Sequence, residues 1–301
     1  MIKTYHNLKI PELIYIPVLS SLMNRALFKL EIRELSKIKE DKLGLNKEKR
    51  DKPIIASLTS FPARIEIVSY TVLTLLNQML KPDRLILWLA EEQFPDKKLP
   101  EKLTGLIKYG LEIKWCDDLR SHKKYYYAIM ENPNSIVVTF DDDIIYPEDY
   151  LYKLYKTHLE FPDAVVCNKA HKINIKNGVI LPYNSWKTPL GFGTNSPEWL
   201  LMPVGCGGVL YPPGCLEDEV FNIENIKSLA SAVDDIWLKF MSVLKGKKAI
   251  LTTSYFRTLT CVPGSQTVHL AQSNCMNGNN DACFKKMLSA YPEFWSKVEE
   301  E

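Results

Sequence analysis

Short apolar runs alternate with segments whose apolar residues recur at helical spacing between residues 54 and 252. This alternation constrains the fold most, because strands joined through helices form βαβ units and a largely parallel sheet. The runs are apolar throughout, as in sheets that helices cover on both faces. The runs occupy residues 54–58, 85–89, 111–115, 135–140, 164–167 and 249–252, and helical patterns fall near residues 68–79, 99–107, 121–130, 147–160 and 234–244. The sequence therefore predicts an α/β fold with a Rossmann-like, mostly parallel sheet flanked by helices.

Charge and cysteine content narrow the class of protein. The 301 residues include 38 Lys and Arg against 36 Asp and Glu, which gives a net charge of +2. Proteins that bind nucleic acids usually carry a marked basic excess, so we expect no nucleic-acid partner. The seven cysteines include no CxxC pair and are odd in number, which favours free thiols in a reducing cytoplasm over a disulfide framework. We therefore expect a cytoplasmic protein.

Three regions are expected along the chain. Residues 1–52 form an N-terminal helical extension, residues 53–252 the main α/β domain, and residues 253–301 a C-terminal segment that completes the site. Residues 10–30 have apolar residues at helical spacing, but prolines and charges interrupt them, so no membrane-spanning helix is expected. This helix either packs on the main domain or lies on a membrane surface. Residues 184–214, rich in Gly, Pro, Trp and Asn, are expected to form a long loop region.

Three consecutive aspartates, Asp141, Asp142 and Asp143, directly follow the apolar run at residues 135–140. Three carboxylates at the end of a strand repel one another unless a cation neutralises them. In open α/β sheets, that end of a strand is also where ligands bind. Mg²⁺ and Mn²⁺ prefer oxygen ligands and are often held by one or two carboxylates together with substrate phosphates. The triplet therefore predicts a Mn²⁺ or Mg²⁺ site, and the alternative is an acidic turn that caps the next helix.

The triplet and its flanking residues resemble a known enzyme family. Residues 135–147, SIVVTFDDDIIYP, are similar to the strand and DxD motif of GT-A fold glycosyltransferases. Residues 54–64, IIASLTSFPAR, resemble their first strand and nucleotide-binding loop, and residues 74–89 resemble the next helix and strand of family 2-like members. The resemblance covers residues 53–252 and implies a GT-A fold, a nucleotide-sugar donor and a divalent metal ion.

The resemblance also implies roles for individual residues. Asp143 would bind the metal ion that holds the donor diphosphate, and Asp141 would assist through the metal or its waters. Asp142 would lie near the ribose or the donor sugar. The loop after the first strand would surround the base and ribose with Thr59, Ser60, Phe61 and Arg64. Phe61 offers a stacking face to a base, although Phe61 and Pro62 also fit a packed turn.

Two further elements are candidates for contact with the donor. Lys123 and Lys124 lie near the start of the helix that precedes the triplet, where ammonium and backbone N–H groups can meet phosphate. A solvated basic patch is the alternative for these lysines. Gly207 and Gly208 end a Gly-Cys-Gly-Gly stretch that would let the backbone approach the donor and acceptor sugars closely. A tight turn between strands is the alternative for the glycines.

The acidic pair Asp234 and Asp235 supplies the candidate catalytic base. Inverting transfer of a sugar needs a carboxylate that takes the proton of the acceptor hydroxyl as it attacks the anomeric carbon. The pair resembles the acidic pair of family 2-like enzymes, and we choose Asp235 first and Asp234 second. Asp234 also fits an N-cap, because a helical stripe follows it. His269 is a candidate metal ligand, as many GT-A enzymes bring a C-terminal His to the metal, and residues 274–281 are either a lid or a surface loop.

These features predict a divalent-metal-dependent glycosyltransferase that moves a sugar from a nucleotide-sugar, expected to be a UDP-sugar, to a glycan or lipid-linked acceptor. Assembly of a surface polysaccharide or lipid-linked glycan would place it at the inner face of the membrane. A retaining mechanism is an alternative, since the GT-A scaffold supports both outcomes. A nucleotidyltransferase is disfavoured because no Gly-rich, Lys-containing loop follows the first strand. The alternative outside the enzymes is a non-catalytic carbohydrate-binding protein with a structural cation. The aromatic candidates for stacking on sugar rings are Tyr183, Trp186, Trp199 and Trp237.

Overall fold

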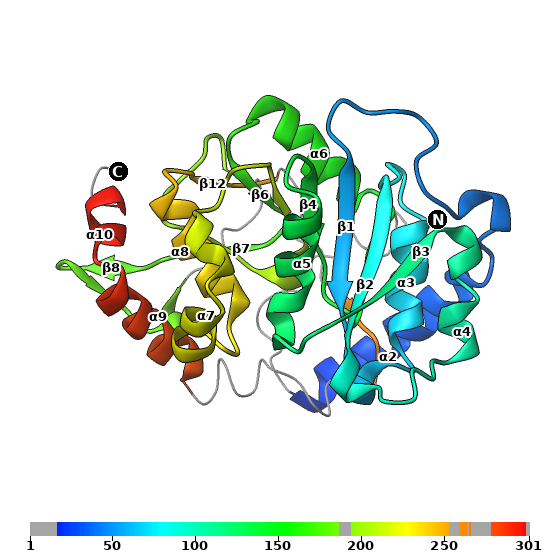
Figure 1. The fold of residues 1–301 in the computed structure, drawn as a ribbon. Coiled ribbons are helices and arrows are strands. Elements are labelled where there is room, and N and C mark those ends of the chain that lie inside the picture. The colour runs from blue at the N-terminus through cyan, green and yellow to red at the C-terminus, as the bar shows by residue number, and fades with distance from the viewer. Residues whose placement is uncertain (1–16, 187–193, 253–258, 264, 266–277, 299–301) are drawn as a thin grey trace.

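A seven-stranded sheet forms the centre of the computed structural model, which describes residues 17–186, 194–252, 259–263, 265 and 278–298 (Figure 1). The strands lie in the order β12-β6-β11-β4-β1-β2-β3, and β11 alone among these seven runs antiparallel to its neighbours. Their bounds are β1 Ile54–Thr59, β2 Arg84–Ala90, β3 Leu111–Cys116, β4 Ile136–Thr139, β6 Val165–Cys167, β11 Val209–Tyr211 and β12 Ala249–Leu251. The predicted α/β fold, with a Rossmann-like, mostly parallel sheet flanked by helices, is confirmed.

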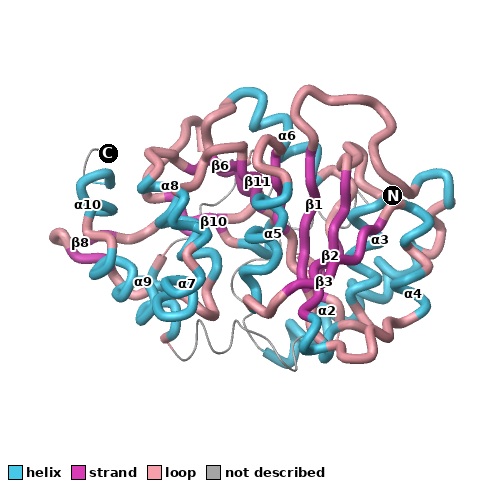
Figure 2. Tube along the Cα trace, in the orientation of Figure 1, coloured by secondary structure: helices cyan, strands magenta, loops and turns pink. Residues whose placement is uncertain are grey.

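Helices cover both faces of the sheet because successive strand residues point in opposite directions. On β1, Ile54, Ala56 and Leu58 join the core formed with α3, α4 and α6, whereas Ile55 packs with Ala128 of α5 on the other face. Figure 2 shows these helices, and the group α7 to α10, arranged around the strands. The bounds are α3 Val68–Leu76, α4 Glu101–Thr104, α5 Lys123–Glu131, α6 Tyr150–Glu160, α7 Ile223–Leu229, α8 Asp234–Leu244, α9 Asn279–Ala290 and α10 Glu293–Val298.

The expected long loop at residues 184–214 is wrong in part. Its described residues include strand β10, Leu201–Pro203, and strand β11, whose three residues are buried between β4 and β6. Each of these strands is only three residues long, and glycines and prolines flank β11, so neither strand gives a periodic pattern that the sequence reveals. Residues 187–193 lie outside the described residues.

Three two-stranded sheets accompany the central one. Strand β10 pairs with β7, Ala170–Lys172, and β8, Ile175–Lys176, pairs with β9, Val179–Ile180. The third pair joins β5, Ile144–Ile145, to β13, Thr260–Cys261. This last pair brings part of the C-terminal segment beside the residues that follow the aspartate triplet.

The N-terminal extension contains helix α2, Pro17–Leu35. The helix contacts β13, and the ring of Phe28 meets that of Tyr70 on α3 edge-to-face, with centroids 5.5 Å apart. Of the two interpretations of this segment, the described residues fit a helix packed on the main domain, and contact with a membrane stays a prediction. Among the described helices, none is long and apolar enough to cross a membrane.

Candidate active site

The aspartate triplet follows β4 after one residue, Phe140, at the edge of the sheet where β1 and β6 also end and where β11 begins. Asp142 and Asp143 are only 4% and 6% exposed, whereas Asp141 is half-buried. Buried carboxylates are costly unless cations or hydrogen-bond donors compensate them. The groups that compensate the triplet therefore define the chemistry of this edge.

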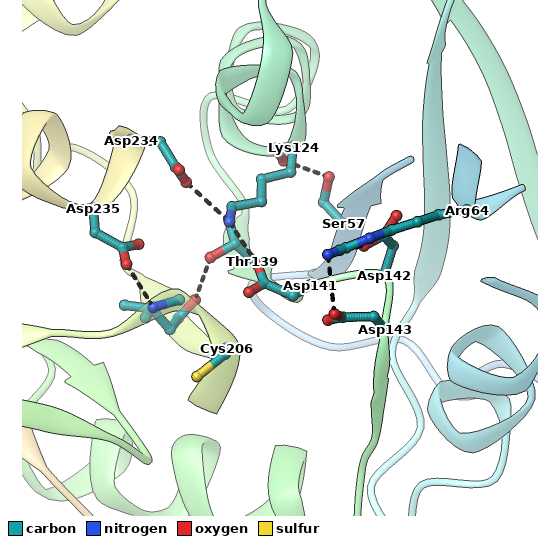
Figure 3. A network of polar contacts seen from close by, with 12 residues as sticks. Ser57, Arg64, Lys124, Thr139, Asp141, Asp142, Asp143, Cys206, Asp234 and Asp235 are labelled. Atoms are coloured by element: carbon teal, nitrogen blue, oxygen red, sulfur yellow. Dashed lines mark hydrogen bonds and ion pairs between the residues drawn. The ribbon is translucent and has the colours of Figure 1, made fainter. Parts of the chain in front are cut away.

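Arg64 compensates two of the three aspartates (Figure 3). It ends the short 3₁₀ helix Pro62–Arg64 in the loop after β1, and its Nη1 lies 2.6 Å from Asp142 Oδ1 while its Nη2 lies 3.2 Å from Asp143 Oδ2. Ser60 Oγ donates a second hydrogen bond to Asp142, at 2.6 Å from Oδ2. The guanidinium also lies over the ring of Phe61, 5.5 Å from its centroid. The loop predicted to surround a nucleotide thus anchors Asp142 and holds Arg64 against the triplet.

Lys124 links the triplet to the second acidic pair. It lies in the first turn of α5, is buried, and places its Nζ 2.8 Å from Asp141 Oδ1 and 2.9 Å from Asp234 Oδ2. Burial works to lower the pKa of Lys124, but Asp141, Asp234 and Asp235 together raise that pKa well above its ordinary value. Lys124 is therefore a permanent cation between two acidic elements that lie far apart in the sequence.

Asp234 and Asp235 occupy the first turn of α8, and their environments differ. Burial raises the pKa of Asp235 to about 7, with Asp234 as the next cause, and Asp235 Oδ2 accepts a hydrogen bond from Gly205 N at 3.0 Å. For Asp234, burial acts in the same direction, but Lys124 and His122 outweigh it and the pKa falls below its ordinary value. One carboxylate thus stays ionised while its neighbour titrates near neutral pH. This division is what an acid–base catalyst requires.

The glycine that borders this polar cluster is Gly205, the first residue of the Gly-Cys-Gly-Gly stretch of which only Gly207 and Gly208 are predicted site residues. A Cβ there would lie 2.7 Å from Asp235 Oδ1, 3.2 Å from Lys124 Nζ and 3.6 Å from Asp141 Oδ1. The two glycines that the sequence does single out meet other groups. A Cβ on Gly207 would lie 2.4 Å from Lys169 Cβ, and a Cβ on Gly208, which has φ +78°, would lie 2.9 Å from the ring of Phe140. Gly207 and Gly208 therefore serve the packing of the loop against its neighbours.

Gly207→Ala should lower the free energy of unfolding by about 1–3 kcal/mol, because the added Cβ would overlap Lys169 Cβ and lie 2.8 Å from Lys169 N. Gly205→Ala should cost less, since its two nearest atoms belong to the ends of the Asp235 and Lys124 side chains. Urea denaturation of both variants would measure the difference. Equal losses would show that the rigid backbone at Lys169 is not what distinguishes the two positions.

Several predicted site residues lie apart from this cluster. Lys123 forms an ion pair with Asp118, and Thr59 donates its hydroxyl to Trp88 O at 2.8 Å. His269 lies outside the described residues. Residues 279–281 of the predicted lid or loop form the first turn of α9, so that part of the expectation is wrong. Of the aromatic candidates, Trp186, Trp199 and Trp237 are buried in the core and Tyr183 is half-buried.

The C-terminal segment reaches the triplet through its described residues. Val262 N donates to Asp143 O at 2.8 Å, and Arg64 Nη2 donates to Ser265 O at 3.2 Å. Cys261 lies on β13, which pairs with β5 immediately after the triplet. The described residues 260–262 and 265 therefore lie beside the triplet.

The fit of a divalent cation depends on the charge at this edge. Burial raises the pKa of Asp143 to about 6, and its neighbours Asp142 and Asp141 add to the rise while Arg64 opposes it. Among the described residues of this edge, Asp141, Asp142, Asp143, Asp234 and Asp235 face the cations Arg64, Lys124 and Lys169. Negative charge is therefore in excess among these residues, which favours a cation.

The oxygen donors for such a cation are few. Among the described residues, no group of three His, Cys, Asp or Glu side chains is arranged to hold a metal ion. Asp142 accepts hydrogen bonds from both Ser60 and Arg64. Asp141 pairs with Lys124 and Asp143 with Arg64 at 3.2 Å, so at these two carboxylates a cation would replace fewer or longer contacts. Mg²⁺ and Mn²⁺ sites commonly use one or two carboxylates with waters and substrate phosphates, so two carboxylates fit a cation that a phosphate ligand completes.

Comparison with known proteins gives no family. No protein-family model matches the chain, and no curated protein matches it. The similar solved structures include one titled "Crystal structure of 4-diphosphocytidyl-2C-methyl-D-erythritol synthase", with 8% sequence identity and a TM-score of 0.37. The likeness covers 59% of this chain and 86% of that chain. A similarity at this level says nothing of function, so the function is inferred from the site itself.

Proposed function

We propose that this chain is a divalent-metal-dependent glycosyltransferase that moves a sugar from a nucleotide-sugar, with UDP as the expected carrier, to a glycan or lipid-linked acceptor. One observation carries the proposal. Asp235, a carboxylate that titrates near neutral pH, lies in the same polar cluster as Asp141 of the triplet, and Lys124 and Gly205 connect them. A base and a phosphate-facing acidic motif at one sheet edge are the two parts that glycosyl transfer needs.

The reaction we propose is a direct displacement. The acceptor hydroxyl oxygen forms a bond to the anomeric carbon of the sugar, and the bond from that carbon to the diphosphate oxygen breaks. Asp235 receives the proton of the hydroxyl, so the acceptor oxygen is not left positively charged. Lys124 keeps Asp234 ionised beside it, which holds the proton-accepting role on Asp235. Displacement from the opposite face inverts the configuration of the sugar.

The metal ion would be held by Asp141 and Asp143, with His269 proposed as a further ligand. When bound, a divalent cation stabilises negative charge on the departing diphosphate. Ser60, Phe61, Thr59 and Arg64 keep their proposed place near the base and ribose. Asp142 is reassigned, because its contacts with Ser60 and Arg64 make it a residue that positions Arg64. Lys123 is left out of the proposed site, since it pairs with Asp118.

The test is a screen of common nucleotide-sugars with purified protein, Mn²⁺ and no acceptor. We expect slow hydrolysis of one donor, which EDTA abolishes and Mn²⁺ restores, because water can take the place of the acceptor hydroxyl. Release of nucleoside diphosphate is the measurement. A protein that binds no nucleotide-sugar in calorimetry but binds oligosaccharides would instead be the carbohydrate-binding protein. Retention at the anomeric carbon of the transfer product would replace the inverting mechanism with the retaining one.

A further inference from the structure

Lys169 is a third cation at the same edge of the sheet, and neither the acidic motif nor the candidate base accounts for it. It is the second residue after β6 and is half-buried. Val204 N donates a hydrogen bond to the carbonyl oxygen of Lys169 at 3.0 Å. The Cβ of Lys169 occupies the space that a side chain at position 207 would need. Gly207 therefore provides the space in which Lys169 lies against the loop that carries Gly205.

The three cations of the edge differ in how far they are neutralised. Arg64 pairs with Asp142 and Asp143, and Lys124 pairs with Asp141 and Asp234. Within the described part of the chain, the only group that accepts a hydrogen bond from Lys169 Nζ is Cys206 Sγ, at 3.4 Å. An ammonium has three N–H donors, and a thiol is a weak acceptor.

Lys169 and Cys206 shift the pKa of each other. Burial raises the pKa of the Cys206 thiol, which favours the neutral S–H form. Interaction with Cys206 is the largest cause that raises the pKa of Lys169, and Asp141 adds to it, so the ammonium stays charged at neutral pH. Lys169 is thus a cation near Asp141, and the described residues accept a hydrogen bond from only one of its three N–H donors.

An incoming anion gains most from a cation that carboxylates have not already neutralised. Arg64 and Lys124 are each already paired with two aspartates, whereas the described partner of the Lys169 ammonium is a thiol. Charge-assisted hydrogen bonds to phosphate are among the stronger polar contacts in proteins. The difference in their partners therefore makes Lys169 the best candidate for anion binding among the three cations.

We propose that Lys169 is the anion-binding residue of the site and donates hydrogen bonds to a phosphoryl oxygen of the donor's diphosphate. This inference rests on the proposed function, since it takes a nucleoside diphosphate as the ligand. It assigns Arg64 and Lys124 a different role, which is to hold the five aspartates in place. Lys169 would then share the charge of the departing diphosphate from the side of Cys206.

The test is calorimetry with Mn²⁺ and whichever of UDP, GDP, ADP and CDP the wild-type protein binds most tightly. Lys169→Met should weaken binding about 10- to 100-fold, the range expected for loss of a hydrogen-bonded charge. Lys169→Arg should recover most of the affinity, because the cation is restored. Lys172→Met is the matched control and should change little, since Lys172 is an exposed β7 residue paired with Glu198 at 2.6 Å.

The outcomes separate the two proposals. If the wild type binds one of the diphosphates and Lys169→Met binds it equally well, the role of Lys169 is wrong and the proposed function stands. If the wild type binds none of them, the proposed function itself fails. Should Lys169→Met not fold, as a thermal melt would reveal, Lys169→Gln keeps a polar end without the charge and makes the same comparison.

Discussion

Asp235→Asn is expected to leave donor binding nearly unchanged and to reduce the rate of sugar transfer about 10²- to 10⁴-fold, the contribution typical of a general base. Asparagine has almost the same shape and still accepts the hydrogen bond from Gly205 N, now made at 3.0 Å. It has no basic carboxylate, however, and does not take the proton of the acceptor hydroxyl. Calorimetry with the donor and steady-state transfer rates would measure the two effects separately.

The pH dependence of the wild type provides a second measurement of the same assignment. Since burial raises the pKa of Asp235 to about 7, the reactive, ionised form is lost as the pH falls below that value. The kcat/KM for transfer should therefore rise about tenfold per pH unit below pH 7 and become level above it. Asp235→Asn should lack this rise over the same range.

Asp234→Asn is the matched control, because it removes a carboxylate from the adjacent position. Asp234 is a cause of the raised pKa of Asp235, so its neutralisation should shift the rise in kcat/KM to lower pH. Transfer should fall less than in Asp235→Asn. Normal transfer by Asp235→Asn would move the base elsewhere, and a greater loss in Asp234→Asn would assign the base to Asp234.

The sequence predicts the scaffold of this site well, because the scaffold depends on periodic patterns. The apolar runs of β1, β2 and β3 are long enough to be distinguished from helix, and α8 coincides with the predicted segment at residues 234–244. The position of the triplet also follows from the pattern, since it begins one residue after the end of β4. Strand β11, with three residues, is too short to give any period.

The partners of the site residues are what periodicity does not reveal. Arg64 and Asp142 are 78 residues apart, and Lys124 reaches both Asp141 and Asp234 across different elements. The sequence offers Lys123 and Lys124 equally as candidates for contact with the donor. Helix α5 directs only Lys124 to the aspartate triplet, whereas Lys123 pairs with Asp118, outside the site. Lys169 carries no motif at all. Its one signal is a charged residue soon after a buried strand, which is the end where ligands bind in parallel sheets.

Charge balance explains why the triplet divides into two roles. A buried carboxylate requires compensation whether or not it binds a ligand, and Arg64 supplies it to both Asp142 and Asp143. Asp142 has a further hydrogen bond from Ser60, so it is fully engaged by its own protein. Asp143 shares Arg64 at the longer distance, and burial raises the pKa of both Asp142 and Asp143. We therefore expect a cation to contact the triplet on the Asp143 side.

Asp143→Asn should consequently weaken the binding of Mn²⁺ by more than about 100-fold, and the binding of the donor in the presence of Mn²⁺ by a similar factor. Loss of a residue that only supports a metal ligand typically weakens metal binding about 10- to 100-fold, and a carboxylate that itself contacts the metal should contribute more. Asp142→Asn is a close control, because it also removes one carboxylate charge that is paired with Arg64. The affinity of this variant for Mn²⁺ should remain within a few-fold of wild type. Electron paramagnetic resonance of Mn²⁺, with and without nucleoside diphosphate, would measure both. Equal losses would mean that the placement of Arg64, rather than a metal ligand, controls donor binding. The triplet would then be a structural acidic turn, and the metal-dependent mechanism would lose its basis.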